Sequence, residues 1–104
     1  MDYFGEYLRS KREQLGLPLR KVAAALDIDT SILSKIERNE RRATIEMLPI
    51  LAKKLEVQDK EMEIEFIKTS ILSDFRELKF LKNGLEETLI AIKSRRKILV
   101  QITR

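Results

Sequence analysis

The stretch from Leu15 to Asn39 limits the possible folds most, because its sequence is typical of two short helices joined by a tight turn. Residues 22–26 read Val-Ala-Ala-Ala-Leu, a run of small apolar residues that predicts a compact helix. A turn is expected at residues 27–29, whose polar residues favour capping of a second helix over residues 30–38. Because alanine side chains are small, the two helices can cross at close range.

The second of these helices has an apolar face and a polar face. Leu33 and Ile36 share one face at helical spacing, with Ile32 at its margin, and are expected to pack inward. The residues left on the outward face are Thr30, Ser31, Ser34, Lys35 and Arg38. Their hydrogen-bonding groups have the lengths that reach base edges and phosphates, which predicts a helix that reads the major groove of DNA. The alternative is an ordinary solvated helix face.

A wider set of motifs surrounds this helix pair. The motifs are Leu8-x-x-x-Arg12, Gly16-Leu17, Val22-Ala23, Ile28, Leu33-Ser34-Lys35-Ile36-Glu37-Arg38 and Leu48-x-x-Leu51-Ala52-x-x-Leu55. With them, residues 8–57, about half of the chain, resemble the phage-repressor (Cro and Xre-type) helix-turn-helix family. The resemblance implies an all-α fold, a lambda-repressor-like helix-turn-helix bundle. Thr30, Ser31, Ser34 and Lys35 are then the expected base-contacting residues.

The resemblance also implies a structural ion pair. The family usually pairs an arginine of its first helix with a glutamate that ends its third, and Arg12 and Glu37 stand at those positions. A partly buried pair would tie the two helices together, and loss of one partner would leave the other charge unpaired.

Some positions differ from the family's usual pattern. Leu19 stands where a glutamine that touches the DNA backbone is usual. Asp27 and Asn39 stand where glycine is usual, and both residue types tolerate the left-handed conformation better than other non-glycine residues. Pro49 lies inside the helical segment that begins near Thr44, where it removes one early hydrogen bond. We therefore expect both turns to form and the fourth helix to start irregularly.

Basic residues around the helix pair are candidates for contacts with the DNA backbone. Arg41 and Arg42 follow the predicted reading helix, where proteins of the resembled family approach the phosphates. The full set of candidate phosphate contacts is Arg20, Lys21, Arg38, Arg41 and Arg42. The alternative for residues 40–42 is a charged surface loop without DNA contact.

Composition narrows the function classes. The 104 residues include no cysteine and no histidine. Disulfides, thiolate metal sites and the commonest general base are therefore excluded, and we expect no enzyme, no metal and no cofactor. Acidic pairs such as Glu86-Glu87 lack the His or Asp neighbours of a metal site. No apolar run approaches a membrane span and no signal peptide precedes Asp2, so a cytoplasmic, nucleoid-associated protein is expected.

Net charge is unevenly distributed along the chain. Residues 1–57 contain 11 basic and 9 acidic residues, a net charge of +2. Residues 58–92 contain 5 and 8, a net charge of −3, and residues 93–104 contain 5 and none, a net charge of +5. The middle segment is therefore a poor phosphate-binding surface and is better suited to contact with a partner helix. The basic residues 94–97 are interpreted as a solvated terminus.

A seven-residue apolar repeat dominates the second half of the chain. Its members are Ile64, Ile71, Leu78, Leu85, Ile92 and Leu99, with Ile67, Phe75, Leu81 and Leu89 at neighbouring positions. Such a repeat favours a helix that packs along its length on another helix. Asn83-Gly84 interrupts it, so we expect one helix over residues 59–82 and another over 85–98, folded as a hairpin, or else a single long helix.

These patterns together predict two regions and a function. Residues 1–58 are expected to form a helix-turn-helix DNA-binding domain, and residues 59–104 a helical dimerisation extension. The expected dimerisation residues are Ile64, Ile71, Leu78, Leu85 and Ile92. The expected function is a transcriptional regulator, most simply a repressor, that binds double-stranded DNA as a homodimer on a palindromic operator. In the alternative, the protein is an antitoxin or adaptor whose C-terminal helices bind a partner protein, or the apolar stripe covers the body of its own chain.

Overall fold

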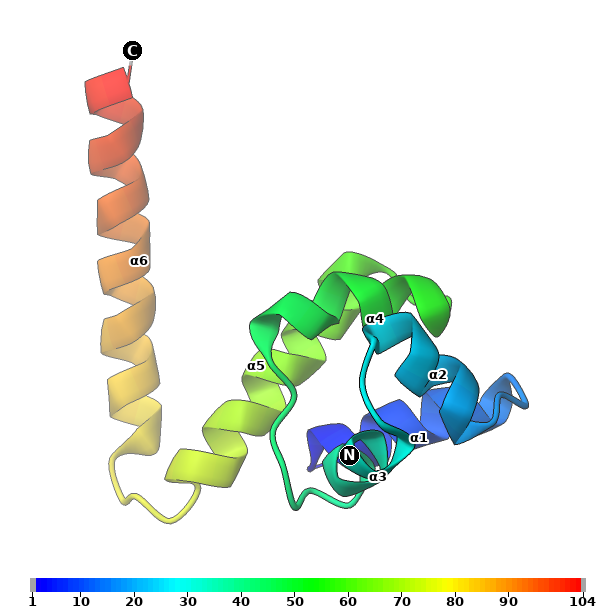
Figure 1. The fold of residues 1–104 in the computed structure, drawn as a ribbon. Coiled ribbons are helices and arrows are strands. Elements are labelled where there is room, and N and C mark those ends of the chain that lie inside the picture. The colour runs from blue at the N-terminus through cyan, green and yellow to red at the C-terminus, as the bar shows by residue number, and fades with distance from the viewer. Residues whose placement is uncertain (1, 104) are drawn as a thin grey trace. The chain divides into compact units, whose positions relative to one another are not determined.

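The computed structural model describes residues 2–103, with side chains described as far as Arg95. Over this range the chain is helical and contains no strand, which confirms the all-α fold (Figure 1). The chain forms two compact units, Met1–Asp74 and Phe75–Arg104. The predicted helix pair lies entirely within the first unit.

The first unit is built from short helices. They are α1 (Phe4–Gln14), α2 (Leu19–Leu26), α3 (Thr30–Glu37), the 3-10 turn η1 (Ile45–Met47), α4 (Leu48–Lys54) and α5 (Asp59–Phe75). The helices α2 and α3 are the pair predicted from the sequence, and residues 27–29 form the turn between them. The helix-turn-helix expected from the sequence is therefore present.

Side chains from the first four helices build one apolar core. Leu8 of α1, Val22 of α2, Leu33 of α3 and Leu51 of α4 are almost completely buried. Ala23 is buried between them, and its small side chain lets α2 lie close to α3. Burial of such aliphatic side chains stabilises the folded state by about 1.5–3 kcal/mol each.

Sharp turns in this unit use the left-handed backbone conformation. The φ angles are 67° at Gly16, 55° at Asp27, 62° at Asn39 and 56° at Glu56. The conformations of Asp27 and Asn39 confirm that these residues can replace the glycines usual at such turns. The left-handed Glu56 after α4 has no counterpart among the sequence-based predictions.

The start of α1 contacts the end of α3 directly. The Gly5 N–H donates a hydrogen bond to Asn39 Oδ1 at 3.0 Å. A Cβ atom at residue 5 would lie 2.2 Å from the Ile36 carbonyl oxygen and 2.6 Å from the Glu37 carbonyl oxygen. Because backbone atoms occupy that space, only glycine fits here.

The fourth helix starts irregularly, as Pro49 predicts. The 3-10 turn η1 precedes α4, and Pro49 lies in the first turn of α4. A missing N–H is tolerated there because the first N–H groups of a helix have no partner within the helix. The inward residues Leu48, Leu51 and Leu55 are buried as expected.

The helix α5 packs on the other helices of the first unit through one face. Met62 is completely buried, Thr69 is nearly so, and the Phe66 ring meets the Phe4 ring edge-on at a centroid distance of 5.3 Å. The domain boundary was predicted at residue 58, whereas the first compact unit extends to Asp74. The difference arises because these contacts hold α5 against α1. The seven-residue repeat did not reveal this face, since none of its members lies on it.

The opposite face of α5 is apolar and exposed. Ile64 and Ile67 are 50% and 54% exposed, whereas Ile71 is half-buried. The helix therefore has two apolar faces, of which only one is covered within the described residues.

The second unit contains α6 (Leu81–Thr103). The break before α6 lies at residues 76–80 and not at Asn83-Gly84. The helix predicted over 59–82 therefore starts at Asp59 as expected but ends at Phe75, and the predicted bounds 85–98 of the next helix are wrong. Asn83 and Gly84 lie in the first turn of α6, where poor helix formers are tolerated because few intrahelical hydrogen bonds depend on them. Leu78 lies in the connection, so the repeat does not follow one continuous helix.

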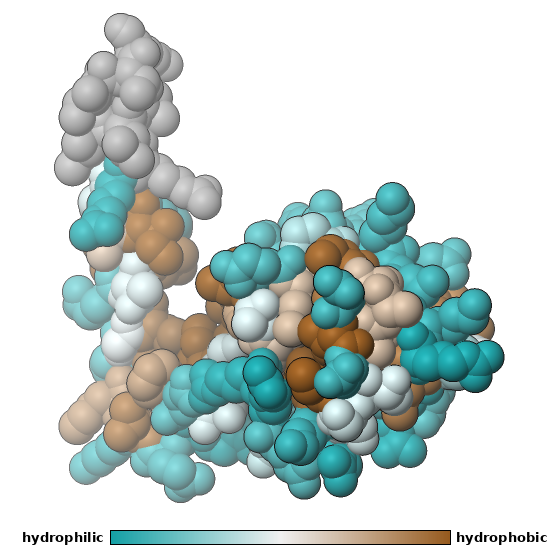
Figure 2. All heavy atoms as spheres, in the orientation of Figure 1, coloured by the Kyte–Doolittle hydropathy of each residue, from teal (hydrophilic) through white to brown (hydrophobic). Residues whose placement is uncertain are grey.

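Apolar side chains remain exposed on α6. Leu85, Leu89 and Ile92 are exposed, and helical spacing places all three on one stripe with Leu81. Figure 2 shows hydrophobic residues along the described part of this helix. The side chain of Leu99, the last member of the predicted repeat, lies outside the described residues. Among the helices described, none combines the length and apolarity needed to cross a lipid bilayer.

Candidate nucleic-acid interface

The helix α3 buries one face and presents the other to solvent. Leu33 and Ile36 are buried in the core, as their spacing predicts. On the outward face, Thr30, Ser31 and Lys35 are exposed and Ser34 is half-buried. The outward face therefore offers hydroxyl groups and an ammonium group on a helix of only eight residues.

An ion pair fixes α3 to α1. Arg12 Nε donates to Glu37 Oε2 at 2.7 Å, and Arg12 Nη2 donates to Glu37 Oε1 at 3.0 Å. Arg12 Nη1 also donates to the Leu17 carbonyl oxygen at 2.8 Å. The structure therefore brings together the two residues that the family resemblance pairs. Only 6% of the Glu37 side chain is exposed, so the pair is largely shielded from water.

The Glu37 carboxylate favours the charged form of Arg12. The hydrogen bonding of Arg12 to the Glu37 carboxylate raises the pKa of Arg12 above its usual value. Because the guanidinium group uses three donors on two neighbours, α3 is held at a defined angle to α1 and to the turn after it. This geometry positions the outward face of α3 through its C-terminal end, where Glu37 is the last residue, and not only through the core.

The basic residues beside α3 are exposed, and they differ in whether they form an ion pair. Arg20 and Lys21 are exposed in the first turn of α2. Arg38, also exposed, donates from Nε to the Ser34 carbonyl oxygen at 3.3 Å and pairs with Glu40 at 3.1 Å. These contacts lie at the surface, where an ion pair exchanges readily with another anion.

The adjacent residues Arg41 and Arg42 have different surroundings. Both are exposed, but Arg41 forms no ion pair within the described part of the chain. Arg42 Nη1 donates to Asp74 Oδ2 at 3.0 Å, and Arg42 Nη2 donates to Asp74 Oδ1. Hydrogen bonding within this pair raises the pKa of Arg42 and lowers the pKa of Asp74. Asp74 belongs to the last turn of α5.

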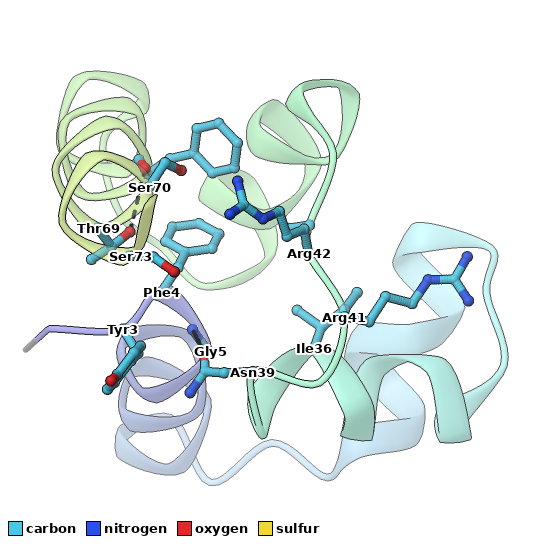
Figure 3. Close-up of a pocket in the computed structure, with 12 residues that line it drawn as sticks. Tyr3, Phe4, Gly5, Ile36, Asn39, Arg41, Arg42, Thr69, Ser70 and Ser73 are labelled. Atoms are coloured by element: carbon cyan, nitrogen blue, oxygen red, sulfur yellow. Dashed lines mark hydrogen bonds between the residues drawn. The ribbon is translucent and has the colours of Figure 1, made fainter. Parts of the chain in front are cut away.

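A small cavity lies beside this loop. Its volume is about 140 Å³, and its walls come from the start of α1, the end of α3, the loop and α5 (Figure 3). The rings of Phe4 and Phe66 and the side chain of Ile36 make part of the wall apolar, and Ser70 and Ser73 add hydroxyl groups. None of the predicted base-contacting residues lines it.

Among the described residues, no group of His, Cys, Asp and Glu side chains could hold a metal ion. The predicted contact residues on α3 and beside it carry hydroxyl, ammonium and guanidinium groups. These groups bind phosphates and base edges.

Two structural features, the Arg42–Asp74 pair and the close contact at Gly5, were not predicted from the sequence. Asp74 is 32 residues from Arg42, and nothing in its own segment indicates an arginine partner. Gly5 looked like an ordinary helix residue, although a glycine in the first turn of an amphipathic helix can indicate a close backbone contact.

Residues 8–61 match the model of a helix-turn-helix family. The matched segment makes up just over half of the chain. No curated protein and no solved structure matched in the other two comparisons. The match covers α2, α3, α4 and most of α1, including Arg12 and Glu37. This family consists of DNA-binding regulators and is not typically enzymatic. The chain therefore belongs to the Xre/Cro-type helix-turn-helix family of DNA-binding regulators.

Proposed function

We propose that the protein is a sequence-specific transcriptional repressor that binds a palindromic operator as a homodimer. One observation carries this proposal: the outward face of α3 holds exposed hydrogen-bonding side chains on a helix fixed by the Arg12–Glu37 pair. A reading helix must be both exposed and rigidly placed to distinguish base pairs. Repression follows most simply from a small protein that occludes the DNA where it binds.

The proposed base readers are Thr30, Ser31, Ser34 and Lys35. Lys35 has the reach and the donors to bind O6 and N7 of guanine, which is among the commonest specific contacts in the major groove. The hydroxyl groups of Thr30 and Ser31 can donate hydrogen bonds to base edges or accept them. Ser34 is half-buried on the same face of α3.

The proposed backbone anchors flank α3 on two sides. Arg20 and Lys21 lie at the start of α2, and Arg38, Arg41 and Arg42 follow the reading face of α3. Contacts of this kind set register and contribute affinity for any sequence. Within the loop after α3, Arg41 is more available to a phosphate than Arg42, because it is exposed and carries no ion pair among the described residues.

The proposed dimer uses the apolar stripe. Ile64 and Ile71 lie on α5, Leu85 and Ile92 lie on α6, and Leu78 lies in the connection. A second copy of the chain would cover these side chains, as sustained apolar stripes on helices normally require. Two α3 helices would then enter successive major grooves about 34 Å apart.

Selection of bound sequences from random double-stranded DNA tests this function. The expected result is an inverted repeat whose half-site centres are separated by about one helical turn, or 10–10.5 base pairs. Recovery of an unrelated mixture with purely salt-dependent affinity would contradict sequence-specific reading. A single half-site without a repeat would contradict the homodimer.

The exposed stripe on α6 also favours a second candidate, an adaptor or antitoxin that binds a different protein. Light scattering of the purified chain separates the two candidates. A dimer mass supports the repressor, and a monomer mass with DNA binding supports an adaptor whose apolar face awaits another protein. The proposed place of action is the cytoplasm, on the bacterial or phage DNA that such a regulator would bind.

A further inference from the structure

Arg42 is held by a carboxylate where a DNA-binding residue needs to be free. Both of its terminal nitrogen atoms donate to Asp74, one to each carboxylate oxygen. The planar guanidinium group binds a carboxylate and a phosphate through the same parallel pair of N–H donors. A phosphate can therefore bind Arg42 in this fashion only after Asp74 has left.

We propose that Asp74 competes with the DNA backbone for Arg42, so that this carboxylate reduces the affinity of the protein for DNA of any sequence. The inference rests on the proposed function, because it assigns Arg42 to the DNA backbone. It goes further in naming an acidic residue, outside the segment that matches the family, as a determinant of affinity.

The position of Asp74 in α5 supports a role outside helix stability. It lies in the last turn of α5, which ends at Phe75. A negative charge near a helix C-terminus is unfavourable, because the helix dipole places partial negative charge at that end. Arg42 offsets this repulsion, so Asp74 and Arg42 are each other's counter-charge at the surface.

The neighbouring Arg41 shows what an unrestrained arginine looks like in the same loop. In Figure 3 the Arg41 side chain extends away from α5, whereas the Arg42 side chain extends toward α5. The two residues have the same charge and adjacent positions, and both are exposed. The difference between them is therefore the acid on α5.

The energetic scale of the competition is small and measurable. Arg42 is 65% exposed and Asp74 36% exposed, so the pair lies in water and its net strength is that of a surface ion pair. Removal of the Asp74 charge should strengthen DNA binding by about two- to fivefold, which corresponds to the strength of such a pair. The gain should be equal on the operator and on random DNA, because a phosphate contact carries no sequence information.

The test uses Asp74→Asn in the full chain, with DNA affinity measured over a series of salt concentrations. The expected results are tighter binding and a salt dependence of log K that is steeper by up to about one unit, since one more effective phosphate contact is made. Salt dependence is the informative readout, because a merely structural role of Asp74 would leave it unchanged. In an Arg42→Ala background, Asp74→Asn should have no effect on affinity.

Glu63→Gln is the matched control, because Glu63 is another exposed acid of α5 and forms no ion pair among the described residues. An equal gain from Glu63→Gln, or a gain from Asp74→Asn that persists with Arg42→Ala, would reduce the effect to net charge and overturn the proposal. Weaker binding by Asp74→Asn would also overturn it, since Asp74 would then orient Arg42 for DNA. A wild-type chain that binds no duplex would refute the proposed function itself, whereas binding insensitive to Asp74 refutes only this inference.

Discussion

Lys35 and Arg41 make different contributions under the proposed function, although both are exposed cations of the first unit. Lys35 projects from the outward face of α3, where a base edge fixes which donors are satisfied. Arg41 lies in the loop after α3, where any phosphate satisfies it. The two roles are separable because sequence preference and salt dependence are measured independently.

Substitution of each cation by alanine should separate these roles. Lys35→Ala should cost about 1–3 kcal/mol on the selected operator and relax the preference at one base pair in each half-site. Arg41→Ala should weaken binding to all sequences alike and lower the salt slope by about one. Binding assays on operator and random duplexes measure both. Equal losses on the two duplexes for Lys35→Ala would contradict a base-reading role.

The Arg12–Glu37 pair is a residue-scale determinant of the stability of the fold. Because both side chains are largely buried, Arg12→Ala or Glu37→Ala should each lower the free energy of unfolding by about 3–5 kcal/mol. The double substitution should recover part of this loss, with a coupling of about 0.5–3 kcal/mol, because it leaves no buried charge unpaired. Thermal and denaturant unfolding measure the cycle.

Arg9 and Glu13 provide the matched control for this cycle. They form an ion pair at 2.8 Å within α1, but both side chains are more than half exposed. Their coupling should be far smaller than that of the Arg12–Glu37 pair, because water screens them. Comparable couplings in the two cycles would show that burial is not what makes the inner pair matter.

At the scale of helices, the sequence predicted what local patterns encode and missed what depends on distant contacts. The pair α2 and α3 followed from apolar spacing and turn residues, and the irregular start of α4 followed from Pro49. The break at residues 76–80 was placed wrongly, because Asn83-Gly84 resembles a helix end but lies in a first turn. The docking of α5 was missed because Phe66 packs on Phe4 of α1 and Met62 joins the core, so both meet residues far away in sequence.

Met62 tests whether α5 belongs to the first unit. Met62→Ala should lower the free energy of unfolding by about 2–5 kcal/mol, because it leaves a cavity at a completely buried position. Ile45→Ala is the control, since Ile45 is 69% exposed, and it should change stability by less than about 0.5 kcal/mol. Denaturant unfolding at one fixed protein concentration measures both. A negligible effect of Met62→Ala would show that α5 folds apart from the helix-turn-helix.

At the scale of the whole molecule, two apolar surfaces remain without a partner within the described residues. One is the outer face of α5 with Ile64 and Ile67, and the other is the stripe of α6 with Leu85 and Ile92. A chain of 104 residues buries a modest core, so association would add apolar burial that the monomer lacks. The proposed dimer covers these surfaces and links two reading helices at once.

The role of the α6 stripe in dimerisation can be tested with substitutions at two positions of this helix. Ile92→Asp places a charge in the stripe, whereas Ile90→Asp places the same charge about half a turn away on the opposite side of α6. Ile92→Asp should convert the dimer to a monomer and reduce operator affinity by about 100-fold or more, because the second half-site contact is lost. Sedimentation and operator binding measure this. A dimer that survives Ile92→Asp but not Ile90→Asp would place the interface on the other side of α6.

The contact at Gly5 has a consequence for how far this sequence can change while keeping its fold. Position 5 admits a single amino acid, because the carbonyl oxygens of Ile36 and Glu37 fill the space of any side chain. Gly16 has open space but a φ of 67°, so asparagine or aspartate is an acceptable replacement there. Gly84 has open space in a helix and admits most residues. In a randomised library selected for folding, the most invariant position would therefore be a residue without a side chain, which lets α1 touch the end of α3.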